Sequence, residues 1–205
     1  MIPYDTRSFQ EIGPGQMAEL CSYSKVELHR FLNHAGNPPG KFKVYEDSLL
    51  GICLCQGAAQ HYVDMSSEDK FDNELYIDER KVKEKGYMVW PGGRVISGIK
   101  DIDVFFFFVA HDHVSIPNIR HCRKSVIAKF SDIGEYRIDF MKKGISKEIV
   151  DAMKDGNPIN VILQYLKYTH HGQAYLSKQS VVGLYPDEIF GKIIWKTKRL
   201  VKMLD

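Results

Sequence analysis

The sequence carries no large excess of charge of either sign. Its 28 lysine and arginine residues nearly balance 26 aspartate and glutamate residues, which leaves a formal net charge of +2. This balance removes the simplest argument for a protein that binds nucleic acid through its overall charge, but it permits a local basic patch. A disordered or fibrous chain is excluded too, because 44% of the residues are hydrophobic and only 16 are glycine and 8 proline.

Cysteine is scarce, with four residues in the chain. Cys53 and Cys55 alternate within an apolar stretch, so both point to one side of an expected strand, where a disulfide between them would be strained. We expect free cysteines packed as small apolar groups, and a reducing, cytoplasmic compartment. A disulfide between Cys21 and Cys122 remains open as an alternative.

Long apolar runs are absent as well. The longest, Val104 to Ala110, is far shorter than the roughly 20 residues that a membrane-spanning helix needs. The N-terminal sequence MIPYDTRSFQEIGPGQ lacks the basic start, apolar stretch and cleavage site of a signal peptide. We therefore expect a cytoplasmic protein with no membrane partner.

Hydrophobic periodicity predicts both helices and strands. Ile102 to Val109 is apolar on both faces, as is typical of a central strand covered on both sides. Further strands are expected at Leu49–Cys55 and Tyr136–Met141, and helices at Gln16–Phe31, from Pro158 onward and at Gly172–Leu184. This order predicts the α/β (α+β) class, with a mixed sheet flanked by helices and a C-terminal helical part.

The same pattern divides the chain into three segments. Residues 1–40 form an N-terminal helical segment, residues 41–145 a core, and residues 146–205 a C-terminal helical part packed on the core. Within the core, residues 65–96 are dense in acidic and basic side chains, and we interpret them as an inserted, solvated segment. A lid, a partner surface and a tolerated surface loop are all compatible with this composition.

Three aspartates occupy positions in strands where acids are costly. Asp101 and Asp103 flank Ile102 at the start of the central strand, and the side-chain period of two makes both carboxylates face one way. Asp139 lies within the later strand sequence RIDFM. Buried carboxylates need a partner, and three of them on neighbouring strands would suit Mg²⁺ or Mn²⁺. An Asp-x-Asp pair at a strand end also commonly caps a turn, which is the alternative interpretation.

Several other residues are candidates for contact with an anion or a substrate. His61 and Tyr62 follow the glycine at position 57 closely enough to line the same cleft, or they pack against the sheet. Arg123 belongs to a basic cluster, and Arg137 shares a strand face with Asp139. Both arginines are candidates for phosphate binding, although a solvated basic face explains such residues equally well.

The sequence CQGAAQHY at positions 55–62, followed by GIKDIDV at positions 98–104, resembles the nucleotidyltransferase superfamily, which has the polymerase-β-like fold. More narrowly, it is similar to an uncharacterised prokaryotic group with a QGAA…HY…G[VI]KD[FI]DV pattern. HCR at positions 121–123, QSVV at 179–182 and GKIIW at 191–195 extend the similarity over most of residues 49–195.

The resemblance implies a nucleotidyltransferase that depends on Mg²⁺ or Mn²⁺ and uses a nucleoside triphosphate. Asp101, Asp103 and Asp139 would hold the metal and carry catalysis, with Asp139 helping to activate an acceptor hydroxyl. Gly57 would let the backbone approach the phosphates. Ala58, His61, Arg123 and Arg137 complete the expected nucleotide-binding set. The acceptor is not specified.

One departure from the superfamily favours a different function. Ala58 stands where the superfamily usually has serine or glycine, so the hydroxyl that would contact a phosphate is missing. The alternative hypothesis is therefore a nucleotidyltransferase-like domain that lacks catalysis and binds a protein or nucleic-acid partner.

Overall fold

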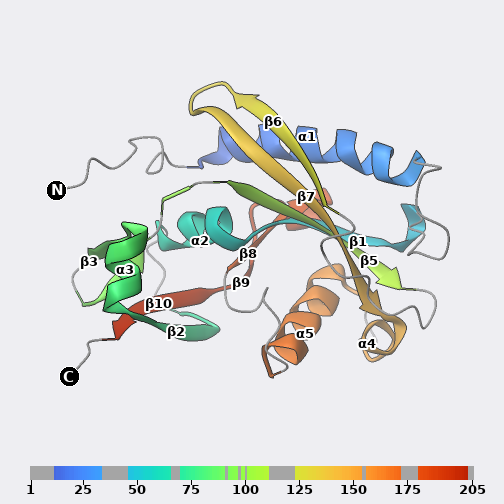
Figure 1. The fold of residues 1–205 in the computed structure, drawn as a ribbon. Helices are drawn as coiled ribbons and strands as arrows, with labels where there is room; N and C mark the ends of the chain where they lie inside the picture. The colour runs from blue at the N-terminus through green and yellow to red at the C-terminus, as the bar shows by residue number, and fades with distance from the viewer. Residues whose placement is uncertain are drawn as a thin grey trace.

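The structure, a computed structural model, describes residues 12–33, 46–65, 70–90, 92–96, 98–99, 101–110, 123–153, 156–171 and 180–202. It holds two β-sheets flanked by helices (Figure 1). This arrangement confirms the predicted α/β (α+β) class with a mixed sheet.

The main sheet has six strands in the order β6-β7-β5-β1-β8-β9. Their bounds are β1 Leu49–Cys55, β5 Ile102–Ala110, β6 Arg123–Phe130, β7 Gly134–Ser146, β8 Val181–Tyr185 and β9 Ile193–Trp195. Strands β5 and β7 are parallel, whereas β1 is antiparallel to both β5 and β8, so the sheet is mixed. The short 3-10 turns η2 (Glu46–Ser48) and η5 (Asp187–Ile189) precede β1 and follow β8.

Helices cover both faces of this sheet, as Figure 1 shows. On one face, α1 (Pro14–Asn33) and α2 (Gln56–Asp64) pack on alternate residues of β5 such as Val104 and Phe106. On the other, α4 (Lys147–Asp151) and α5 (Pro158–His171) pack near Phe105 and Phe107. The four consecutive phenylalanines are all buried. The two-sided apolar pattern of β5 thus corresponds to a strand covered on both faces, as predicted.

The second sheet has four strands in the order β2-β10-β4-β3. It consists of β2 Asn73–Asp78, β3 Met88–Trp90, β4 Arg94–Ile96 and β10 Thr197–Lys202, with α3 (Glu79–Lys85) beside it. Three of these strands come from the charged segment at residues 65–96, and the fourth comes from the far end of the described chain. The segment therefore contains regular structure rather than only a surface loop.

The predicted C-terminal helical part is wrong. In the described residues there, α4 and α5 are the only α-helices, and β8, the short 3-10 turn η5, β9 and β10 follow them. Val181–Tyr185, expected to end a helix, is a strand between β1 and β9. A short run of valine, leucine and tyrosine suits a buried strand as well as a helix face, and pairing with β1 decides the outcome. Residues 172–179 of the expected helix lie outside the described residues.

Candidate functional site

Strand pairing brings together the aspartates that the sequence singles out. Because β5 and β7 are parallel and in register, Asp103 lies directly opposite Asp139. Laterally paired residues point to the same face of a sheet, so both carboxylates face one way. Asp103 is 9% exposed and Asp139 is 0% exposed. Asp101 precedes β5 at the same end.

Arg137 joins two of these carboxylates. Its Nη2 donates to Oδ2 of Asp101 at 2.8 Å and lies 3.1 Å from Oδ2 of Asp139. The sequence predicts Arg137 as a phosphate ligand, whereas in the structure its guanidinium compensates the charge of the carboxylates. The guanidinium lies between Asp101 and Asp139 as their shared counter-charge.

Ser125 is a site residue that sequence reasoning missed. It lies on β6 opposite Asp139, and its Oγ donates a hydrogen bond to Oδ1 of that aspartate. The sequence RKSV offered no signal for this role, since β6 itself was not predicted. Arg137 and Ser125 between them bind both oxygens of the buried Asp139 carboxylate, which satisfies its need for partners.

The start of α2 lies at the same end of the sheet as the aspartates. Strands β1 and β5 are antiparallel with Cys55 opposite Asp103, and α2 begins at the next residue, Gln56. Gln56 has the left-handed φ of 58°, which is uncommon for a residue other than glycine. Cys55, at the N-cap, makes no side-chain hydrogen bond to the first amides of the helix.

Gly57 and Ala58 lie in different environments. A Cβ built on Gly57 would meet no atom within 4 Å, so the glycine leaves open space beside the helix start. Ala58 is completely buried in the core beneath α1 and α2. A serine at position 58 would therefore direct its hydroxyl into the core in this backbone conformation. The absence of a serine hydroxyl at position 58 therefore does not change the groups on the open side of the helix start.

Among the described cysteines, Cys55 lies opposite Asp103 at this end of the sheet. Burial raises the pKa of Cys55 well above its ordinary range, and the neighbouring Cys53 and Asp103 add to the rise. This direction favours the neutral thiol over the thiolate that a nucleophile needs.

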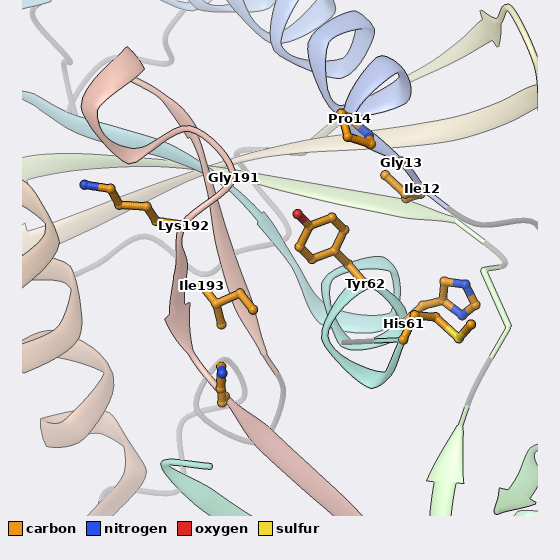
Figure 2. A pocket seen from close by; sticks show the side chains of 10 residues that line it. Ile12, Gly13, Pro14, His61, Tyr62, Gly191, Lys192 and Ile193 are labelled. Atoms are coloured by element: carbon orange, nitrogen blue, oxygen red, sulfur yellow. The ribbon is translucent and has the colours of Figure 1, made fainter. Parts of the chain in front are cut away.

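His61 and Tyr62 line a hollow of about 650 Å³ between the start of α1, α2 and the turn before β9 (Figure 2). Neither Gly57 nor any of the three aspartates lines it. The imidazole of His61 is buried and points away from the Tyr62 ring. His61 and Tyr62 therefore do not share a cleft with Gly57. They line a different hollow, which lies farther along α2.

The basic candidates are only partly described. Arg123 begins β6 opposite Met141, and its side chain lies outside the described residues. Cys122, the possible disulfide partner of Cys21, also lies outside them.

A second buried ionic group was not predicted at all. Nη2 of Arg199 on β10 donates to Oδ2 of Asp64 on α2 at 2.6 Å, and both residues are buried. Gln60 donates to the other carboxylate oxygen at 2.8 Å. Burial raises the pKa of Asp64, although Arg199 and Gln60 oppose the rise. The group links the second sheet to α2. Asp64 and Arg199 are 135 positions apart, so their pairing could not be recognised in the sequence.

The donor chemistry of the aspartates fits a hard divalent cation, since every donor is a carboxylate oxygen. Within the described residues, no three His, Cys, Asp or Glu side chains are gathered closely enough to hold a metal ion as they stand. Metal binding would require the aspartates to reorient, with Arg137 leaving the space between them.

None of the protein families, curated proteins or solved structures compared with the chain matches it. Among the described helices, none combines the length and apolar character required to cross a bilayer.

Proposed function

We propose that the protein is a nucleotidyltransferase that requires Mg²⁺ or Mn²⁺ and moves a nucleoside monophosphate from a nucleoside triphosphate to an acceptor hydroxyl. The supporting observation is that Asp101, Asp103, Asp139 and the open start of α2 all lie at one end of the main sheet. Carboxylates suit a cation and helix amides suit an anion, and both kinds of group lie at this end of the sheet.

The three aspartates are the residues that would hold the metal. A divalent cation there would lower the pKa of the attacking hydroxyl and neutralise charge on the transferred phosphate. Arg137 would then leave Asp101 and Asp139. Because it lies on the same strand two residues before Asp139, its guanidinium would remain close enough to pair with a phosphate oxygen.

The start of α2 would hold the triphosphate. The amides there carry the positive end of the helix dipole, and Gly57 lets a phosphate approach the backbone without meeting a side chain. We also place the protein in the cytoplasm, since Cys21, Cys53 and Cys55 are all free.

Thermal unfolding with ligands tests this proposal. We expect Mg²⁺ or Mn²⁺ together with at least one of ATP, CTP, GTP and UTP to raise the melting temperature. Asp103→Asn should abolish the rise because it removes a buried metal ligand. Glu135→Gln is the matched control, as it neutralises an exposed acid on β7 away from the site and should leave the rise intact. No rise with any of the four nucleotides would contradict the proposal.

Gly57→Ala separates phosphate binding from folding. The added Cβ enters open space and alanine is the better helix former, so stability should stay the same or rise by about 0.5–1 kcal/mol. The same Cβ obstructs an approaching phosphate, so the nucleotide-dependent rise in melting temperature should shrink. An undiminished rise would show that Gly57 does not contact the nucleotide.

A second candidate function is a nucleotidyltransferase-like domain that binds a protein or nucleic acid without catalysis. The observation that favours it is Arg137, which already compensates the Asp101 and Asp139 charges without a metal. Titration of labelled RNA and DNA with the Asp101→Ala/Asp103→Ala/Asp139→Ala variant distinguishes the two. Binding that survives in this variant and needs no divalent cation would support the second function.

A further inference from the structure

The hollow between α1, α2 and the turn before β9 has the properties of a second ligand site. Its volume of about 650 Å³ lies within the range of pockets that bind small molecules. It draws its walls from three parts of the chain that are far apart in sequence (Figure 2).

One side of the hollow is apolar. Ile12 and Pro14 lie at the start of α1, and Ile193 at the start of β9 points toward the Tyr62 ring across the space between them (Figure 2). A flat ring placed there would contact aliphatic side chains and an aromatic face, which is the usual lining of a site for a planar molecule.

The polar side chains of the hollow include a hydroxyl and two ammonium groups. The Tyr62 hydroxyl points toward Gly191, and no described residue offers it a hydrogen-bond partner. Lys192 is exposed at the rim, where its side chain extends away from the Tyr62 ring (Figure 2), and no described carboxylate lies within ion-pair distance of its ammonium. Lys196 adds a further cation. None of the described lining residues is acidic, so the electrostatic preference is for an anion.

We propose that this hollow binds a small flat anion, meaning an aromatic or heterocyclic molecule that carries a phosphate, carboxylate or sulfonate. The ring would lie between Tyr62 and Ile193, and the anionic group would accept a hydrogen bond from the Tyr62 hydroxyl and a second from Lys192, whose exposed side chain would turn toward it. The inference goes beyond the proposed transferase function, because it involves none of the three aspartates and requires no metal.

A panel of matched ligand pairs tests the proposal in the absence of divalent cations. AMP is compared with adenosine, indole-3-acetate with indole-3-acetamide, and naphthalene-1-sulfonate with naphthalene-1-sulfonamide. Binding is followed by the amide NMR shifts of Gly191, Lys192 and Ile193. At least one anion should bind with a dissociation constant of about 1 mM or less, and at least about fivefold tighter than its uncharged partner.

Two variants assign the binding to this hollow. Tyr62→Phe keeps the ring and removes the donor, and together with Lys192→Ala it should weaken binding by about tenfold or more. Lys167→Ala on the exposed side of α5 is the control and should change nothing. Asp103→Asn should also leave the affinity unchanged, so the result does not depend on the transferase proposal.

The proposal is overturned if no anion in the panel shifts these amides, or if the uncharged partners bind equally well. It is also overturned if the Tyr62→Phe/Lys192→Ala variant binds with wild-type affinity.

Discussion

Arg137→Met is the most informative single change at the candidate site. Methionine keeps much of the aliphatic stem and removes the charge that links Asp101 to Asp139. Without the guanidinium, the fully buried Asp139 carboxylate keeps the hydrogen bond from Ser125 but loses the cation that lies 3.1 Å from its Oδ2. The loss of a nearby counter-charge is unfavourable for a buried carboxylate, so the folded state should lose stability.

The structure sets the size of this loss. Removing one partner of a fully buried ion pair costs about 3–5 kcal/mol, whereas an exposed pair is worth about 1 kcal/mol or less. The Arg137 side chain is 47% exposed and that of Asp139 is 0% exposed, so the pair lies between these limits and water screens part of the interaction. We expect a loss of about 1–2 kcal/mol in the free energy of unfolding.

The assay is urea unfolding of the wild type and Arg137→Met, each with and without millimolar Mg²⁺. Under the proposed function, Mg²⁺ should stabilise Arg137→Met more than the wild type, because no guanidinium competes for Asp101 and Asp139. Arg80→Met is the control: Arg80 is 81% exposed in its pair with Asp78, so its loss should cost about 0.5 kcal/mol or less.

Two results would refute this reasoning. Equal stability of the wild type and Arg137→Met in the absence of Mg²⁺ would show that the guanidinium does not compensate the buried charge. A loss of stability that Mg²⁺ restores no better than it stabilises the wild type would show that the cation does not take the place of Arg137. The second result would favour the binding domain over the transferase.

Two further predictions concern folding. Because burial raises the pKa of Asp64, the folded state holds that proton at a higher pH than the unfolded chain does, and the stability from this group is lost as pH rises through the raised pKa. The wild type should therefore gain stability relative to Asp64→Asn as pH falls from about 7 to about 4.5, and a parallel pH dependence of the two unfolding midpoints would contradict this. Gly183→Ala should cost about 2–3 kcal/mol, since its Cβ would lie 2.1 Å from the carbonyl oxygen of Ile189. An unfolding midpoint equal to that of the wild type would show that η5 moves aside without cost.

Local sequence predicted those elements whose burial leaves an unambiguous pattern. Strand β5 could be recognised because it is apolar on both faces, and α5 because Asn157-Pro158 marks its start. Strand β8 could not, since five residues are too few to distinguish a strand period from a helix face. Its pairing with β1, which decides the structure, involves residues more than a hundred positions away.

At the candidate site, too, local geometry could be predicted from the sequence and long-range pairing could not. The sequence places Asp101 and Asp103 on one face, because strand geometry is local. It does not show that Asp139 lies opposite Asp103, because that depends on the register between β5 and β7. The sequence does not predict the partners of Arg137 either. A basic residue beside an acid can pair with a ligand or with the acid itself, and the three-dimensional structure decides between them.

Strand β10 has a consequence for the order in which the chain can fold. It is the last described strand, yet it lies between β2 and β4 and supplies the interior of the second sheet. The hydrogen bond from Lys196 to Asp72 at its start spans 124 residues. During synthesis, β2 and β4 therefore emerge long before the strand that pairs with both, and their edges stay open to other strands until the rest of the chain arrives. The charged side chains of this segment, which the sequence marks as an inserted, solvated segment, would protect the exposed strand edges from aggregation.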